Sequence, residues 1–205
     1  MGLKYLEERI KKDGKLREGN ILKVDSFLNH QIDVELLEVM AEEFKRQFGM
    51  DGVTKVLTIE ASGIAVAVET ARVFGVPMLF AKKSQSKNID GNVYTSRVMS
   101  YTHGRMYDIM VAKEYLGPGD RVLIIDDFLA NGAALAGLIQ LVRDAGAHLC
   151  GCGIAVEKGF QPGGGELRRQ GIKLVSLAVI DRMDAETGEI SFRDETEYKS
   201  IKDIT

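Results

Sequence analysis

The feature that most constrains the fold of this chain is an apolar run that ends in two adjacent acids and a small-residue turn. It occupies residues 122–134 and reads VLIIDDFLANGAA. A run of this kind, rich in β-branched residues, is typical of a buried strand, and the residues after the turn favour a helix. At such a strand–turn–helix junction, free N–H groups and the helix dipole favour an anion such as phosphate.

The two acids, Asp126 and Asp127, indicate a second ligand group at this junction. They lie at the carboxyl end of the predicted strand, where open α/β sheets bind ligands, and carboxylates accept hydrogen bonds from hydroxyl groups. A phosphate beside a diol describes a ribose 5-phosphate. The alternative is an ordinary turn with solvated aspartates. The residues predicted to hold the phosphate are Ala130, Asn131, Gly132, Ala133 and Ala134.

Strand and helix patterns alternate along the chain, which predicts an α/β fold with a mostly parallel central sheet and helices on both faces. Asp33 is the predicted N-cap of a helix that reaches about Phe48, and Gly49 stops it. Residues 83–101 are polar and lack periodicity, apart from a hairpin signal at Asp90–Gly91. Other helices are expected at 1–13, 64–74 and 133–145, and strands at 53–59, 76–81, 105–112, 121–125, 148–157 and 172–179, with a Gly/Pro loop after 157.

Composition excludes several classes of function. The chain has 205 residues and a net charge of -3 without a basic block, so we expect one domain, 1–205, that does not bind nucleic acid. No apolar run approaches the length of a membrane span and no signal peptide opens the chain. Cys150 and Cys152 are expected on the same face of one strand, in the core. We therefore expect a cytoplasmic protein without a membrane association.

A second strand–turn–helix begins at Thr58, and a diphosphate would need such an additional N–H cradle. The residues of this turn are Glu60, Ala61, Ser62 and Gly63. Lys82 and Lys83 end the next predicted strand, and a lid that carries these cations could close over a diphosphate and exclude water. The alternatives are a plain turn and a solvated surface hairpin.

Together these motifs resemble those of the type I phosphoribosyltransferases, which transfer ribose 5-phosphate from phosphoribosyl diphosphate to a base and release pyrophosphate. The resemblance implies that family's fold, with a small hood over the base. It also implies that Asp126 and Asp127 are the catalytic acids, that residues 130–134 bind the 5-phosphate, and that residues 60–63 bind pyrophosphate with Lys83. Mg²⁺ would arrive on the diphosphate, and the chain would form a homodimer near Lys82. Most family members carry Thr where this chain has Asn131.

Two further motifs, ILKVDSFLNHQ at 21–31 and EKGFQP at 157–162, give a closer resemblance to bacterial xanthine phosphoribosyltransferases. In that family a hood, here about residues 1–35, covers the base. The resemblance implies that Leu22, Asn29 and Lys158 bind xanthine, and Phe160 could stack on it. Without the resemblance, these residues would be a core Leu, a helix-entry Asn and a surface Lys.

Two alternatives to a xanthine enzyme stay open. One is a phosphoribosyltransferase for guanine, hypoxanthine or adenine. The other is a regulator that uses the same fold to sense phosphoribosyl diphosphate, although such regulators carry a DNA-binding domain and no basic recognition helix precedes the first core strand here. The three histidines, His30, His103 and His148, form no cluster in the sequence, so no metal site made by protein residues is expected.

Overall fold

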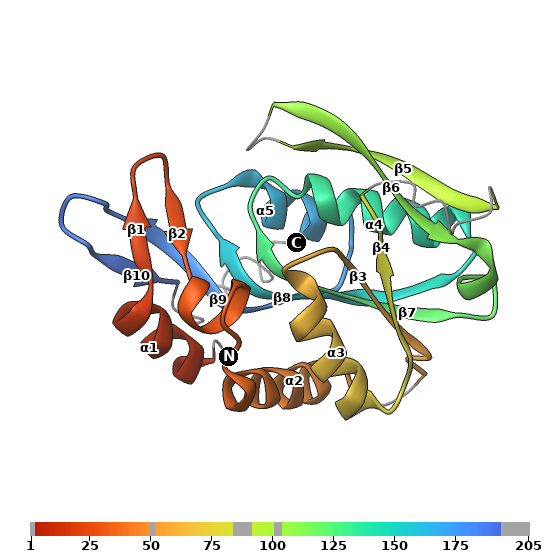
Figure 1. The fold of residues 1–205 in the computed structure, drawn as a ribbon, viewed down its shortest axis with the longest axis horizontal. Coiled ribbons are helices and arrows are strands. Elements are labelled where there is room, and N and C mark those ends of the chain that lie inside the picture. The colour runs from red at the N-terminus through yellow and green to blue at the C-terminus, as the bar shows by residue number, and fades with distance from the viewer. Residues whose placement is uncertain (1–2, 50–51, 84–91, 101–103, 194–205) are drawn as a thin grey trace.

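The centre of the molecule is a six-stranded sheet (Figure 1), seen in a computed structural model that describes residues 3–49, 52–83, 92–100 and 104–193. The strand order is β10-β9-β8-β7-β3-β4. Neighbouring strands from β9 to β4 are parallel, and the edge strand β10 is antiparallel to β9. The bounds are β3 Lys55–Ile59, β4 Met78–Ala81, β7 Arg121–Leu129, β8 His148–Lys158, β9 Leu174–Met183 and β10 Ile190–Phe192.

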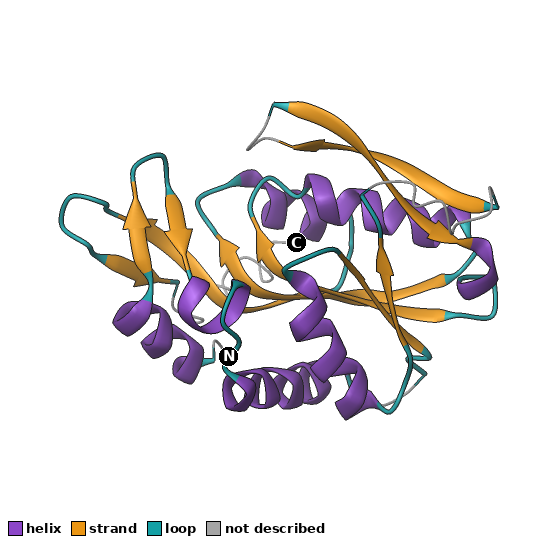
Figure 2. Cartoon of the chain, viewed as in Figure 1, coloured by secondary structure: helices purple, strands orange, loops and turns teal. Residues whose placement is uncertain are grey.

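Helices cover both faces of this sheet (Figures 1 and 2). On one face lie α2 (Val34–Phe48) and α3 (Gly63–Phe74), and on the other lie α4 (Ala133–Asp144) and α5 (Pro162–Arg169). The predicted α/β architecture with a mostly parallel sheet is therefore confirmed. Among the described residues, no helix is long and apolar enough to cross a membrane.

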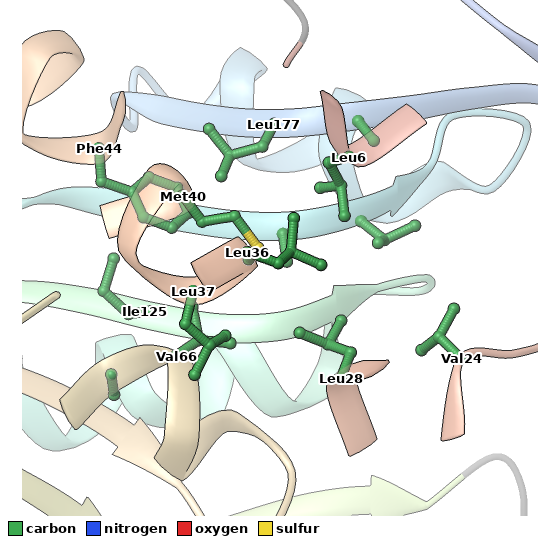
Figure 3. Close-up of a cluster of buried hydrophobic side chains, with 14 of the residues drawn as sticks. Leu6, Val24, Leu28, Leu36, Leu37, Met40, Phe44, Val66, Ile125 and Leu177 are labelled. Carbon is green, nitrogen blue, oxygen red and sulfur yellow. The ribbon is translucent and has the colours of Figure 1, made fainter. Parts of the chain in front are cut away.

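The sheet separates two apolar cores because successive side chains of a strand point to opposite faces. On β7, Ile125 packs with α2 and α3, whereas Ile124 packs with α4. Figure 3 shows the first core, with Leu36, Met40 and Phe44 of α2 turned toward the strands. These three side chains are fully buried, and burying each one is worth about 1.5–3 kcal/mol. This apolar stripe holds α2 against the sheet.

The ends of α2 follow the sequence signals. The N–H of Leu36 donates a hydrogen bond to Asp33 Oδ1 at 3.1 Å, which is the predicted N-cap. At the other end Gly49 has φ +78, a backbone conformation that residues with a side chain rarely adopt. Both predicted boundaries of this helix are therefore confirmed.

The N-terminal segment forms a small subassembly beside the sheet. It consists of α1 (Lys4–Asp13), the antiparallel pair β1 (Lys15–Arg17) and β2 (Ile21–Lys23), and a turn of π-helix, η1 (Asp25–Asn29). Leu6 of α1 is fully buried in the first core, so the apolar stripe of the predicted N-terminal helix anchors it. The β1–β2 hairpin was not predicted.

Residues 93–100 correct the expectation of an irregular polar segment from 83 to 101. They form β5 (Val93–Ser100), which pairs antiparallel with β6 (Arg105–Ala112). The inward side chains include Ser96 and Val98, which are buried, while their neighbours are exposed. A polar residue at an inward position concealed the alternation that marks a strand. The hairpin signal at Asp90–Gly91 lies outside the described residues.

The β5–β6 hairpin lies over α4 (Figure 1). Gly137 of α4 permits this close approach, since a Cβ atom there would lie 2.5 Å from Val98 Cγ2. The other side of the hairpin is tied to the end of β4, where Lys82 and Met110 exchange two backbone hydrogen bonds of 2.9 Å. A short 3-10 turn, η2 (Lys113–Tyr115), then leads toward β7.

The segment after β8 also differs from its prediction. Its Gly/Pro composition favoured a loop, but α5 begins at Pro162. Proline is well tolerated in the first turn of a helix, and Leu167 buries its side chain in the second core. Tertiary packing thus overrides the low helix propensity of the glycines in this segment.

The two cysteines are not equivalent, which corrects the expectation that both are core residues on one face. Cys152 is fully buried, and burial raises its pKa to about 12. Cys150 is only half-buried. Successive residues of β7 pair with Leu149 and Gly151, so Cys150 is the extra residue of a β-bulge, and the bulge breaks the alternation.

Candidate active site

The loop between β7 and α4 has the geometry of an anion site. Gly132 has φ +83 and turns the chain directly into α4. Asn131 Oδ1 accepts a hydrogen bond of 3.0 Å from the Ala133 N–H, which leaves the amide NH₂ of Asn131 as the side-chain donor. All five predicted phosphate residues, 130–134, are half-buried and partly open to solvent. The structure therefore brings them together at a helix N-terminus, where the dipole favours an anion.

The acidic pair lies inside β7 and not after it, because the strand continues to Leu129. Asp126 and Asp127 expose 5% and 6% of their surfaces, so the reading of solvated turn residues is wrong. The Asp127 N–H donates to Asp126 Oδ1 at 3.0 Å. Burial raises the pKa of Asp126 well above its ordinary value, and the neighbouring charge of Asp127 raises it further, whereas the charge of Lys83 lowers it. Among the residues that the structure describes, Asp126 is thus a buried acid with one backbone donor, which is less than a full set for its charged form.

The second predicted turn packs directly on Asp126. A Cβ atom on Gly63 would lie 2.5 Å from Asp126 Oδ1, so only glycine allows α3 to begin this close to the acid. The preceding residues Glu60 and Ser62 are half-buried, and Ala61 is exposed. The structure therefore places the two strand–turn–helix motifs next to each other, as the sequence predicted for a site that binds two phosphate groups.

Lys83 is held at the same place by its backbone. Its N–H donates a hydrogen bond of 2.6 Å to Glu60 Oε1, and its ammonium lies 5.7 Å from the centre of the Tyr107 ring. Lys83 also acts electrostatically on Asp126. The cation predicted for the diphosphate is therefore close to the acidic pair, while residues 84–91, the rest of the predicted lid, lie outside the described residues.

Two residues near Asp126 were missed by sequence reasoning. Thr58 is fully buried and its hydroxyl has no hydrogen-bond partner among the described residues; a Cβ on Gly63 would overlap it. Tyr107 of β6 lies within electrostatic reach of the acid, since burial and then the charge of Asp126 raise the pKa of the tyrosine. No sequence pattern indicates either residue, because it is the strand order of the sheet and the position of the β5–β6 hairpin that bring them to the site.

The three predicted base-binding residues occupy different environments. Leu22 of β2 is 6% exposed and belongs to the first core, as the alternative reading had it. Asn29 ends η1 and is exposed, so its side-chain amide is available. Lys158 ends β8 and is half-buried. Phe160, with 39% of its surface exposed, follows in the next loop.

Lys158 connects β8 to the N-terminal hairpin. Its ammonium donates a hydrogen bond of 2.8 Å to the backbone carbonyl of Asn20, which has φ +59 in the turn between β1 and β2. Burial lowers the pKa of Lys158. The predicted base-reading cation therefore touches the segment predicted to form the hood, through a contact that sequence did not indicate.

Metal-ligand chemistry is sparse in the part of the chain that the structure describes. No group of three or more His, Cys, Asp or Glu residues there could hold a metal ion. His30 and His148 are exposed, and His103 lies outside the described residues.

Comparison with solved structures defines the fold. The chain superimposes on the adenine phosphoribosyltransferase of Giardia lamblia complexed with 9-deazaadenine, with a TM-score of 0.70 and 24% identity over 87% of this chain and 97% of that one. The enzyme of Trypanosoma brucei, in complex with AMP, pyrophosphate and ribose-5-phosphate, gives a TM-score of 0.70 and 17% identity over 96% and 91% of the two chains. This is the type I phosphoribosyltransferase fold, as predicted.

Sequence comparison defines the family. The model of the phosphoribosyl transferase domain matches residues 23–184. A xanthine phosphoribosyltransferase of Lachnoclostridium phytofermentans is 56% identical over 93% of this chain and 98% of its own length. One of Alkaliphilus metalliredigens is 50% identical over 94% and 95%. The chain belongs to the phosphoribosyltransferase family, which confirms the resemblance of its motifs.

Proposed function

We propose that this protein transfers the 5-phosphoribosyl group from phosphoribosyl diphosphate to xanthine, giving xanthosine 5'-monophosphate and pyrophosphate in purine salvage. The observation that carries the proposal is similarity at 50–56% identity, over nearly the full length of both chains, to relatives named xanthine phosphoribosyltransferase. The acidic pair, the two adjacent loops and Lys83 supply the groups that this reaction needs.

In the proposed reaction a ring nitrogen of the base attacks C1 of the ribose. The bond from C1 to the diphosphate oxygen breaks, and pyrophosphate leaves with the electron pair. Asp126 and Asp127 accept hydrogen bonds from the ribose hydroxyls, and their charge favours the cationic transition state. Ribose hydroxyls would give Asp126 the donors that its charged form lacks. No protein nucleophile is required, since positioning and exclusion of water lower the barrier.

The two loops divide the phosphate groups between them. Residues 130–134 hold the 5-phosphate at the start of α4, and residues 60–63 hold the diphosphate at the start of α3. Lys83 contributes a cation to the diphosphate, and its backbone bond to Glu60 fixes where the side chain starts. The proximity of Gly63 to Asp126 supports a position of the ribose between the two phosphate groups.

Base recognition is assigned to Leu22, Asn29 and Lys158. Asn29 offers its amide to a ring edge, and Leu22 offers backbone or apolar contact from the rim of the core. The ammonium of Lys158 would exchange the carbonyl of Asn20 for the 2-oxo group of xanthine, whose easily lost ring proton makes the base partly anionic. This cation favours xanthine over hypoxanthine and adenine.

Mg²⁺ is proposed as the cofactor, carried by the diphosphate and the ribose hydroxyls. The donor set fits this arrangement, because Mg²⁺ commonly binds through substrate phosphates and water, with few protein ligands. When bound, it would neutralise charge on the leaving pyrophosphate. Asp126 and Asp127 would hold the ribose hydroxyls beside it.

We further propose a homodimer in the cytoplasm. Met99 and Met106 face each other across β5 and β6, and both expose 40% or more of their surface, which suits a partner near Lys82, the residue that follows β4 and pairs with Met110 of β6. The two free cysteines suit a reducing compartment. Light scattering at micromolar concentration tests the dimer, and a monomeric mass would overturn it.

The test of function is product formation from xanthine, guanine, hypoxanthine and adenine, each with phosphoribosyl diphosphate and Mg²⁺. We expect the highest kcat/KM with xanthine. A higher kcat/KM with another base would mean that this base, and not xanthine, is the preferred substrate. Tight binding of phosphoribosyl diphosphate without product from any base would favour the sensing regulator.

A further inference from the structure

Three consecutive glycines in the first turn of α5 have different surroundings. Gly163, Gly164 and Gly165 each weaken a helix by about 1 kcal/mol relative to alanine, so a run of three needs a physical reason. Two of them contact other parts of the candidate site, and the third does not. The contacts of the first two glycines show which parts of the molecule α5 packs against.

Gly163 packs on the phosphate loop, backbone against backbone. Its N–H donates a hydrogen bond of 3.1 Å to the Ala130 carbonyl. A Cβ atom on Gly163 would lie 2.6 Å from both that carbonyl oxygen and the Gly132 nitrogen. A Cβ on Gly132 would in turn lie 3.2 Å from the Gly163 Cα. The loop assigned to the 5-phosphate therefore rests on the start of α5.

Gly164 packs on the residue that precedes Lys158. A Cβ atom on Gly164 would overlap Glu157 Oε1. Glu157 is 2% exposed, and both of its carboxylate oxygens accept hydrogen bonds of 2.8 Å from Arg168, about one turn further along α5. Ser176 of β9 also donates to this carboxylate. The same short helix that supports the phosphate loop thus clamps the end of β8.

We propose that α5 is a positioning element that fixes the distance between the 5-phosphate loop and the base-reading end of β8, with Gly163, Glu157 and Arg168 as its positioning residues. This inference rests on the proposed function. A nucleotide has a fixed span from its phosphate to its base, and a misplacement of about 1 Å can cost a hundredfold in rate. A helix that touches both ends of the site holds that span.

The first experiment compares Gly163→Ala with Gly165→Ala, where an added Cβ would meet, among the described residues, only Arg169 Nη1 at 3.5 Å. Both variants add one methyl group to the same helix. We expect Gly163→Ala to weaken binding of phosphoribosyl diphosphate about tenfold or more by calorimetry, and Gly165→Ala to stay within twofold of the parent protein. Equal affinities in the two variants would overturn the role of Gly163.

The second experiment disturbs the contact between α5 and the end of β8. Gly164→Ala should raise the KM for xanthine about tenfold, with a smaller change in the affinity for phosphoribosyl diphosphate. If this variant does not fold, Ser176→Ala removes one donor to Glu157 without overlap and should raise the same KM about threefold. A lowered Tm with an unchanged KM for xanthine and an unchanged affinity for phosphoribosyl diphosphate would mean that α5 is merely structural, and this result would sink the proposal.

The two proposals fail in different ways. Binding of phosphoribosyl diphosphate is measured without any base, so the comparison of Gly163→Ala with Gly165→Ala stands even if xanthine is not the substrate. In that case, the KM of whichever purine is converted replaces that of xanthine in the second experiment. An unchanged affinity in Gly163→Ala contradicts the positioning role alone.

Discussion

Neighbouring strands β7 and β8 each carry a buried acid near their carboxyl ends, and the two acids are treated in opposite ways. Glu157 on β8 is paired with Arg168, which donates a hydrogen bond to each carboxylate oxygen, and it also accepts a hydrogen bond from the hydroxyl of Ser176. Asp126 on β7 is as deeply buried but accepts one backbone hydrogen bond from Asp127, and its pKa is raised by burial and by that second acid. Within the described part of the chain, the first carboxylate has a full set of hydrogen-bond donors and the second does not.

This difference separates a structural acid from a functional one. A buried charge that is paired and hydrogen-bonded holds two elements together, and removing its partner is costly. A buried acid whose pKa is raised by desolvation and by a second acid lacks hydrogen-bond donors to its charged form, and a ligand can supply them. Burial alone would not distinguish Asp126 from Glu157, whereas the donors around each carboxylate do.

The largest effect should come from removing the unsatisfied pair. Asp126→Asn with Asp127→Asn should lower kcat by about 10³-fold or more, because two charged acceptors for the ribose hydroxyls are lost at the developing cation. The Tm should stay equal or rise, since no paired charge is broken. Steady-state kinetics and thermal unfolding measure the two quantities. Normal turnover in the folded double variant would refute the role of the pair.

Breaking the satisfied acid should act first on stability. Arg168→Met leaves the Glu157 carboxylate buried without its cation, which should cost about 3–5 kcal/mol in the free energy of unfolding. Adding Glu157→Gln to Arg168→Met should recover part of this loss, because no unpaired charge is then buried. Urea unfolding of the parent, the single variant and the double variant is the measurement. A single variant as stable as the parent would show that the pair contributes little.

The contrast also explains which parts of the site could be predicted from the sequence. The unit from β7 to α4 follows from contiguous residues, since an apolar run, two acids and Gly132 specify strand, ligand groups and turn locally. The N-cap Asp33 and the stop at Gly49 are local signals of the same kind. Where one short stretch of chain holds all the determinants, the structure has the predicted order of strand, turn and helix, although β7 continues past the acids to Leu129.

The rest of the site depends on partners distant in sequence. The pairing of Glu157 with Arg168 requires α5, whose glycines indicate a loop in the sequence. The structure shows a helix there, with Gly163 packed on Gly132 and Gly164 packed on Glu157. Strands β1 and β2 span three residues each, which is too short for a periodic signal. Leu22 shows the remaining limit, because an apolar residue type alone does not distinguish a core position from the wall of a base site.

A smaller effect is expected at Lys158, which lies next to the satisfied acid but should serve the ligand. Lys158→Met should lower kcat/KM for xanthine about 30- to 150-fold more than for hypoxanthine, because a charge-assisted hydrogen bond to the 2-oxo group is worth roughly 2–3 kcal/mol. The ratio of the two efficiencies, before and after the change, is the measurement. Equal losses for both bases would mean that Lys158 does no more than hold the carbonyl of Asn20.

The smallest effect concerns the pH dependence of stability, and it tests the comparison through one titrating group. Because the folded protein raises the pKa of Asp126, the folded state binds more protons than the unfolded state between the ordinary and the raised pKa. Stability from this group is therefore lost as pH rises through that window. Its charged neighbours, Asp127 and Lys83, are present in both proteins, so a difference between Asp126→Asn and the parent isolates it.

The expected outcome is a gap in Tm that favours Asp126→Asn and widens as pH rises from the ordinary aspartate range toward neutrality. Glu157→Gln is the matched control, since its carboxylate is paired in the folded protein and its loss should not favour the variant at higher pH. Thermal unfolding of the three proteins across that range measures the gap. If Asp126→Asn and the parent keep a constant difference in Tm at every pH, folding does not raise the pKa of Asp126, and the distinction between the two acids fails.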